Sequence, residues 1–246
     1  MGKVFVVNQS LSSIGYVART ITFGEEYDMV NRFVDHVVRH YNGLKKKNAV
    51  IFLEPQVETG YPDIVIAEFY SFPSDENSIR GKLDICDLKI LFHIQQNKRL
   101  AVAQLTNDLG FSTKETMKSI NKLSDGGLVH LSKKKTFVRN ATLHNYYTIK
   151  KLISIEAKLD KWSEAIRQAE YNTWFASESY ILLNKEKCNE NIREKCRDKG
   201  IGIILVNGKI EKILRSGSLG FPSSYASLQF NEWVYKYLNL HSEDEL

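Results

Sequence analysis

The chain has 246 residues, of which 43% are hydrophobic, and its formal net charge is +5 at pH 7. This length and apolar content are sufficient for a real hydrophobic core, in one large domain or in a domain that carries an insertion. No apolar run approaches the roughly 18 residues that a transmembrane helix needs, which excludes a membrane-spanning protein.

The first 74 residues predict an alternation of strands and a helix. A short strand at residues 1–7 leads into a stretch that we expect to be loop or short turns. Apolar residues spaced three and four apart then predict a helix over 25–41. Two apolar runs, 49–54 and 63–70, predict strands separated by a turn that contains Gly60 and Pro62.

Residues 75–150 have a different pattern and predict a separate, basic module. Ten Lys or Arg residues but only four acids lie between Asp87 and Arg139, a charge concentration typical of nucleic-acid binding. The sequence predicts helices over 83–96 and 101–110 and a third over 112–127, opened by a capping box between Ser112 and Glu115. Two short strands around a Lys-rich tip follow, and the whole predicts a winged helix-turn-helix.

In such a module the third helix would lie in a DNA major groove. The residues that we expect to contact the DNA backbone come from this helix and from the hairpin: Lys114, Lys118, Lys122, Lys133, Lys134, Lys135 and Arg139. Those available for base edges are Thr113, Thr116, Ser119 and Asn121. Because many lysines but few residues suited to base edges are present, we expect DNA affinity to depend strongly on salt and only modestly on DNA sequence. Binding of a protein partner, or dimerisation, is the alternative role for this module.

Residues 151–246 again predict an alternation of strands and helices, as the first 74 residues do. A strand at 153–159 alternates apolar and polar residues, and a helix ending near 176, a strand at 179–183 and a polar helix over 185–200 follow. A strand pair with an Asn-Gly turn over 201–214 and a final helix within 221–240 complete the chain. If residues 75–150 are removed, the flanking segments join into a compact α/β core.

Two short motifs on this core carry the chemistry. Pro62-Asp63 opens one strand, and Glu156-Ala157-Lys158 lies on another strand with Glu156 and Lys158 on the same face. In this context the sequence resembles the PD-(D/E)xK nuclease superfamily, over roughly residues 25–74 and 151–214. The resemblance implies an α/β restriction-endonuclease-like core, a mixed central sheet flanked by helices, into which the winged helix is inserted.

The resemblance also implies a metal-dependent phosphodiesterase site. Mg²⁺, which Mn²⁺ can replace, would be held by Asp63, Glu156 and the carbonyl of Ala157, with Glu26 or Glu54 completing the site. Lys158 would orient or deprotonate the attacking water or stabilise the pentavalent phosphate. Gln168 matches the glutamine that follows this motif in some members, although it is also readable as an ordinary helix-surface residue. Glu26, like its neighbour Glu25, could instead simply favour the positive end of the helix over 25–41.

The sequence therefore predicts three segments: core residues 1–74, an inserted DNA-binding module at 75–150, and core residues 151–246. The expected function is a DNA endonuclease in restriction, phage defence or repair. The alternative is a nuclease-like regulator or scaffold that binds DNA and has lost catalysis. Three cysteines that fit no zinc spacing favour a reducing, cytoplasmic location. A homodimer and a protein partner both stay open.

Overall fold

A computed structural model describes residues 2–20, 22–71, 79–141 and 146–242. The chain divides into two compact units, each built from two separated segments. Unit 1 comprises Met1–Ser71 and Ile149–Ser223, and unit 2 comprises Phe72–Thr148 and Ser224–Leu246. The segment boundary expected between residues 74 and 75 lies outside the described residues.

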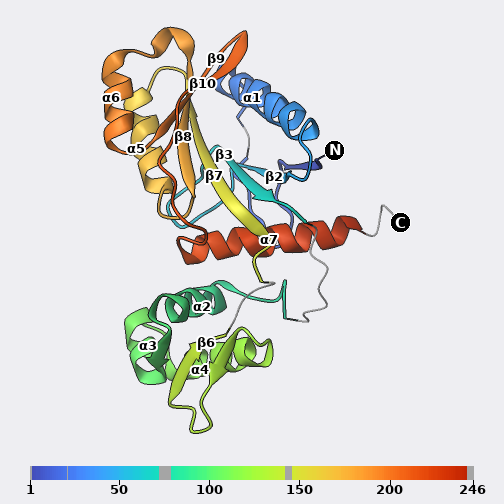
Figure 1. Cartoon of the computed structure of the whole chain (residues 1–246), viewed down its shortest axis with the longest axis vertical. Helices are drawn as coiled ribbons and strands as arrows, with labels where there is room; N and C mark the ends of the chain where they lie inside the picture. Colours follow the sequence, from blue (N-terminus) through green and yellow to red (C-terminus); the bar gives the residue numbers. More distant parts are fainter. Residues whose placement is uncertain (1, 21, 72–78, 142–145, 243–246) are drawn as a thin grey trace. The chain divides into compact units, whose positions relative to one another are not determined.

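Unit 1 is built on a seven-stranded mixed sheet in the order β1-β2-β3-β7-β8-β9-β10 (Figure 1). Its strands are β1 (Val4–Val7), β2 (Asn48–Leu53), β3 (Ile64–Phe69), β7 (Ile149–Lys158), β8 (Glu178–Asn184), β9 (Gly202–Asn207) and β10 (Lys209–Leu214). β2, β3 and β7 form an antiparallel meander, whereas β7, β8 and β9 run parallel. The predicted meander and the helical crossover that follows it are both present.

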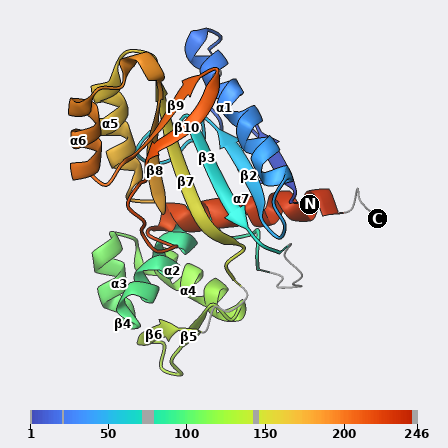
Figure 2. The same cartoon turned by 45° about the horizontal axis from the view of Figure 1, so that its top comes forward.

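Helices cover both faces of this sheet (Figures 1 and 2). The helices are α1 (Glu25–Asn42), α5 (Trp162–Asn172) and α6 (Glu190–Asp198), with a short 3₁₀ turn, η1 (Lys185–Lys187), before α6. Alternating residues of β8 separate the two layers: Tyr180 and Leu182 pack in the cluster that contains α1, while Ile181 and Leu183 pack with α5 and α6. The apolar alternation that predicted strands therefore also distributes the core between two layers.

Unit 2 combines helices with a small sheet of strand order β4-β6-β5. Its elements are α2 (Ile85–Asn97), β4 (Arg99–Ala101), α3 (Val102–Leu109), α4 (Thr113–Asp125), β5 (Val129–Leu131), β6 (Phe137–Asn140) and α7 (Tyr225–Ser242). The predicted capping box of α4 is confirmed, because the Ser112 side chain accepts from the Glu115 N–H and the Glu115 carboxylate accepts from the Ser112 N–H. Gly110 ends α3 in the left-handed conformation.

The C-terminal helix belongs to unit 2, which corrects the expectation that residues 151–246 all complete the core. Leu228 of α7 lies in the apolar cluster of α2, α3 and α4. The Asn231 side chain accepts from the Thr148 N–H at 2.8 Å, and Glu232 pairs with Arg80 at 3.4 Å, with both charged groups buried. The sequence could not assign this helix, because apolar periodicity reports that a helix is buried but not against which partner.

Two expectations from composition, on membrane-spanning helices and on the cysteines, can be compared with the structure. Within the described ranges, no helix combines the length and apolarity required to cross a bilayer. Cys86, Cys188 and Cys196 are all free thiols.

Candidate active site

Three acidic residues lie in one row across the sheet where β2 ends and β3 begins. Leu53 pairs with Ile64, and Ile64 pairs with Ile155, so the next residue on each strand brings Glu54, Asp63 and Glu156 into register. The Glu54 N–H donates to the Asp63 carbonyl at 3.0 Å, which extends the β2–β3 ladder to this row. The meander thus collects acids that are 9 and 93 residues apart in the sequence.

Asp63 is 5% exposed and is anchored to the neighbouring strand. Its Oδ2 accepts the Ala157 N–H at 2.7 Å and lies 3.7 Å from Lys158 Nζ, while Oδ1 lies 3.8 Å from Arg19. Burial raises the pKa of the Asp63 carboxyl, and the positive charge of Lys158 opposes that rise. The carboxylate is therefore held in a fixed position by one backbone donor and two cations.

Glu156 is the most deeply buried acid of the row, at 2% exposure. Asn172 on α5 donates from Nδ2 to Glu156 Oε1 at 2.6 Å, but Oε2 is buried and has no hydrogen-bond partner among the described residues. Burial, and then the negative charge of Asp63, raise the Glu156 pKa well above the ordinary range. A buried acceptor without a donor costs about 1–3 kcal/mol, so this atom marks a place where a cation would be stabilising.

Lys158 contributes a positive charge beside the acids. Its Nζ donates to Glu26 Oε1 at 3.0 Å and to the Ala157 carbonyl at 2.9 Å. Desolvation acts to lower the Lys158 pKa, but attraction by Asp63 and Glu26 outweighs it and leaves the pKa raised. The amine is thus protonated at neutral pH, which favours charge stabilisation over water deprotonation among the roles considered for it.

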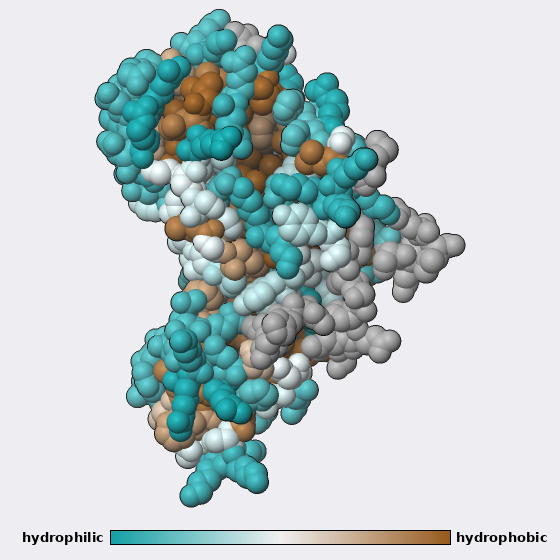
Figure 3. Space-filling view, viewed as in Figure 1, coloured by the Kyte–Doolittle hydropathy of each residue, from teal (hydrophilic) through white to brown (hydrophobic). Residues whose placement is uncertain are grey.

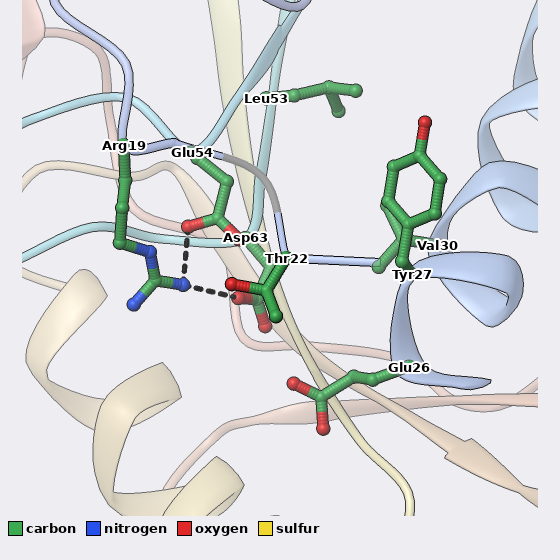
Figure 4. A pocket seen from close by; sticks show the side chains of 8 residues that line it. All are labelled: Arg19, Thr22, Glu26, Tyr27, Val30, Leu53, Glu54 and Asp63. Atoms are coloured by element: carbon green, nitrogen blue, oxygen red, sulfur yellow. Dashed lines mark ion pairs between the residues drawn. The ribbon is translucent and has the colours of Figure 1, made fainter. Parts of the chain in front are cut away.

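Arg19 is a site residue that sequence reasoning missed. It comes from the stretch predicted as loop, and its guanidinium lies 2.6 Å from Glu54 and 3.8 Å from Asp63 (Figure 4). The stretch is fixed because Tyr16 is buried and the Arg19 N–H donates to the Glu54 carbonyl at 3.0 Å. The apolar residues of this loop, of which Ile14 and Tyr16 are buried, were the available signal that the segment packs.

A pocket opens over two acids of the row, Glu54 and Asp63, while Glu156 is not among its lining residues (Figure 4). It is lined by the preceding loop, by the first turns of α1 and by the facing ends of β2 and β3, and its residues are Arg19, Thr22, Glu26, Tyr27, Val30, Leu53, Glu54 and Asp63. Both candidates for the additional acid, Glu26 and Glu54, face it. Glu54 has a positive φ of 52° and a pKa raised by burial, against which its hydrogen bond to Arg19 acts.

Gln168 lies on α5, but its neighbour on the same helical face makes the contact with the acids. Asn172, four residues later, reaches Glu156, while the buried Gln168 Oε1 has no hydrogen-bond partner among the described residues. Residues four apart lie on one side of a helix, so Gln168 and Asn172 share the side of α5 that faces Glu156. The sequence carried no signal that distinguished the two amides.

The acids do not form a ready metal cage. Within the described part of the chain, no group of three or more His, Cys, Asp or Glu side chains is gathered closely enough to hold a metal ion. Arg19 and Lys158 instead lie between the carboxylates and neutralise part of their charge. The donor types nevertheless suit a hard divalent cation, because Asp63, the unpartnered Glu156 oxygen and the Ala157 carbonyl are all oxygen ligands.

In unit 2 most of the predicted DNA-contacting residues are exposed. The tip between β5 and β6 presents Lys133, Lys134 and Lys135, β6 presents Arg139, and α4 presents Lys114 and Lys118. In the small sheet Arg139 pairs with Arg99 on one side and with His130 on the other, and all three are exposed. The basic surface therefore extends beyond the expected set onto a row of the sheet.

Three residues of α4 differ from the expectation. Lys122 turns inward, where its Nζ forms an ion pair with the buried Asp87 and donates to the Lys82 carbonyl at 2.6 Å. Thr116 and Ser119, expected at base edges, are 0% and 5% exposed. An amphipathic helix buries one side, and these positions fall on that side.

Known proteins do not identify the chain. Comparisons with models of protein families, with curated proteins and with solved structures found no match. The assignment of a function therefore depends on the residues and geometry described above.

Proposed function

We propose that the chain is a metal-dependent nuclease of the PD-(D/E)xK type that hydrolyses DNA phosphodiester bonds. The observation that carries this proposal is the cluster of acidic side chains around Glu156. Four carboxylates, of Glu26, Glu54, Asp63 and Glu156, surround only two cations, and a buried Glu156 oxygen has no hydrogen-bond partner among the described residues. The raised Glu156 pKa means that this carboxyl keeps a proton when no cation is bound, and a divalent ion at the site would take the place of that proton.

Asp63, Glu156 and the Ala157 carbonyl are the residues that would hold Mg²⁺ or Mn²⁺. Glu54 or Glu26 would complete the set. When bound, the ion would supply a Lewis acid that lowers the pKa of water and stabilises negative charge on the phosphate. Binding would compete with the cations that now contact the same acids, and so would release Lys158 and Arg19 toward an incoming phosphate.

Lys158, Arg19 and Asn172 would then have separate roles in the reaction. Lys158, protonated at neutral pH, would stabilise charge that accumulates on the phosphate. Arg19, whose side chain is 53% exposed, lies at the mouth of the pocket and would orient the DNA backbone. Asn172 keeps the Glu156 carboxylate in place through Oε1, so that Oε2 stays available.

Unit 2 supports DNA as the substrate. Its helices, its small sheet and the exposed lysine tip suit the winged helix-turn-helix that the sequence predicts, inserted into a restriction-endonuclease-like core. The exposed basic residues provide phosphate contacts, which position a protein on DNA without specifying a sequence. We propose that this unit delivers DNA to the acidic row of unit 1, and that double-strand cutting would require a homodimer.

One observation favours a second function. The acids are already neutralised in part by Arg19 and Lys158, and the described residues contain no preformed group of three metal-binding side chains. A DNA-binding regulator on a lapsed nuclease fold would retain such a site as a structural ion network. Cleavage and metal binding separate the two functions.

The test measures plasmid cleavage in Mg²⁺ and in Mn²⁺, with Mn²⁺ binding measured by calorimetry. We expect wild-type protein to cut and to bind Mn²⁺, Asp63→Asn to lose both, and Lys158→Met to lose cutting only. Lys150→Met, an exposed change on the same strand, is the matched control. Cutting that survives both active-site changes would refute the proposal, and DNA binding without cutting in either ion would support the regulator.

A further inference from the structure

Unit 1 has a second pocket, distinct from the acidic row, on the face of the sheet that α1 covers only in part. Its floor is apolar and comes from β3, β7, β8 and β9, and its walls are α1 and the β9–β10 hairpin. The apolar residues of the floor are Ile66, Ile153, Ile155, Tyr180 and Ile204. Figure 3 shows brown apolar surface in a hollow between α1 and this hairpin, with teal polar side chains around it.

The size of this pocket suits a small organic molecule. Its volume is about 400 Å³, within the roughly 300–1,000 Å³ that is typical of small-molecule sites. Walls on two sides make it a groove for a narrow ligand, since Phe33 and Val37 line it from α1 and Ile210 from the hairpin. Most of the floor is already 1–4% exposed, so an apolar chain would cover chiefly the half-buried Ile153 and Ile210.

With the two lining histidines of α1, His36 and His40, counted as neutral, the lysines of the pocket rim exceed its acids by one. The Glu178 carboxylate lies 2.5 Å from Lys151 and accepts from the Tyr180 hydroxyl at 2.9 Å. The Glu68 carboxylate lies 3.8 Å from Lys47 and also accepts from the Tyr41 hydroxyl. Both acids of the rim are therefore already matched by a lysine.

Lys212 is the lysine of the rim that is not matched by an acid of the rim. Its Nζ donates to the Tyr180 hydroxyl at 3.2 Å and lies 4.5 Å from the centroid of the Tyr180 ring. Both contacts are with a neutral group, and among the described residues no carboxylate lies within ion-pair distance of this amine. Partial desolvation is the main cause of a lowered Lys212 pKa, which the negative charge of Glu178 opposes. Lys212 is an exposed residue, so water solvates its amine, and an anion bound beside it would form an ion pair that the described residues do not supply.

We propose that this pocket binds an amphipathic carboxylate, with the apolar chain on the isoleucine floor and the carboxylate on Lys212. The ligand class follows from the combination of an apolar floor, two walls and a single unmatched cation. A cationic amphiphile lacks a carboxylate that is free to receive it, and a neutral one leaves Lys212 without a counter-ion.

The test titrates the full chain with decanoate below its micellar concentration, followed by calorimetry. We expect saturable binding of one decanoate per chain, at least tenfold weaker binding of decanol, and no saturable binding of decyltrimethylammonium. Lys212→Gln should weaken decanoate binding at least tenfold and leave decanol binding unchanged. Lys150→Gln, on β7 and outside the pocket, should bind decanoate as the wild type does.

A second variant guards against a misfolded protein. Ile153→Glu places a charge on the floor and should abolish decanoate binding while the protein retains its wild-type circular dichroism spectrum. Equal affinity for all three amphiphiles, or decanoate binding that is unchanged in Lys212→Gln, would overturn the proposal. So would the absence of saturable decanoate binding. None of these results depends on DNA cleavage.

Discussion

The two ends of strands β3 and β7 carry charged residues in contrasting arrangements. At one end Asp63 and Glu156 face each other in the cross-strand register, so like charges meet. At the other end Glu68 pairs in register with Lys151, which in turn lies 2.5 Å from Glu178. The same two strands thus present an acidic cluster at one end and an alternation of signs at the other.

This contrast separates charges that stabilise the fold from charges that are available for function. Alternating charges on neighbouring strands satisfy each other, and their removal should affect stability only. Like charges that are buried together are destabilising until a further cation arrives. The acidic end is therefore the one from which metal binding and phosphodiester cleavage are expected, and the matched end provides a control for cleavage within the same protein.

The largest expected effect compares one acid from each end. Glu156→Gln removes a proposed metal ligand and should lower Mg²⁺-dependent plasmid cleavage by about 100-fold or more, because the ion and its electrostatic stabilisation are lost. Glu178→Gln, on the adjacent strand, should change the cleavage rate less than about twofold. Initial rates on supercoiled plasmid provide the measurement. Equal losses from both changes would remove the distinction between the two ends.

The pH dependence of stability gives the next largest effect. A raised Glu156 pKa means that the folded state holds a proton which the unfolded state releases above its ordinary pKa of 4.5. The free energy of unfolding should therefore be highest below that value and fall as pH rises through the folded-state pKa.

Glu156→Gln should flatten this fall by up to about 1.4 kcal/mol per pH unit, and Asp63, whose pKa is also raised, should account for a remainder. Urea unfolding in EDTA between pH 5 and pH 8 measures it, and adding Mg²⁺ to the wild type should oppose the fall. A slope that is identical in wild type and variant would contradict the assignment.

A smaller effect is expected at the matched end. Lys151→Met removes the partner of Glu178, whose side chain is 13% exposed. We expect the free energy of unfolding to fall by about 1 kcal/mol, since a largely buried carboxylate loses a charged neighbour. Chemical denaturation measures the loss, Lys150→Met controls for the strand, and plasmid cleavage should be unaffected.

The smallest effect concerns a single exposed lysine of unit 2. Lys134→Gln removes one phosphate contact at the tip between β5 and β6. Affinity for duplex DNA should fall modestly for every sequence, and the slope of log K against log salt should decrease by about one. Fluorescence anisotropy at several salt concentrations measures the slope.

Lys122→Gln, which removes the inward partner of Asp87, should instead lower stability.

The sequence predicted the elements of the fold well because periodicity is a local property. The antiparallel meander, the crossover helix and the capping box at Ser112 all follow from patterns within short windows. The row of Asp63 and Glu156 could be anticipated because two strand motifs fixed it.

The remaining features depend on tertiary packing, which short windows do not encode. Arg19 enters the site because buried Tyr16 anchors its loop. Asn172 contacts Glu156 because of its position on α5, which the sequence did not distinguish from that of Gln168. Lys122 turns inward because Asp87, from a different helix, is buried beside it. The placement of α7 likewise depends on contacts made across the sequence.

Because each unit is built from two separated segments, the arrangement affects both the folding of the protein during synthesis and its division into fragments. The backbone passes from one unit to the other at residues 71–72, 148–149 and 223–224. Unit 2 lacks α7 until residues 225–242 have been synthesised, and the ion pair between Arg80 and Glu232 cannot form before then. A recombinant fragment that stops at residue 223 should expose the apolar surface that Leu228 covers and aggregate, so separate expression of the basic module requires a linker that rejoins residues 148 and 224.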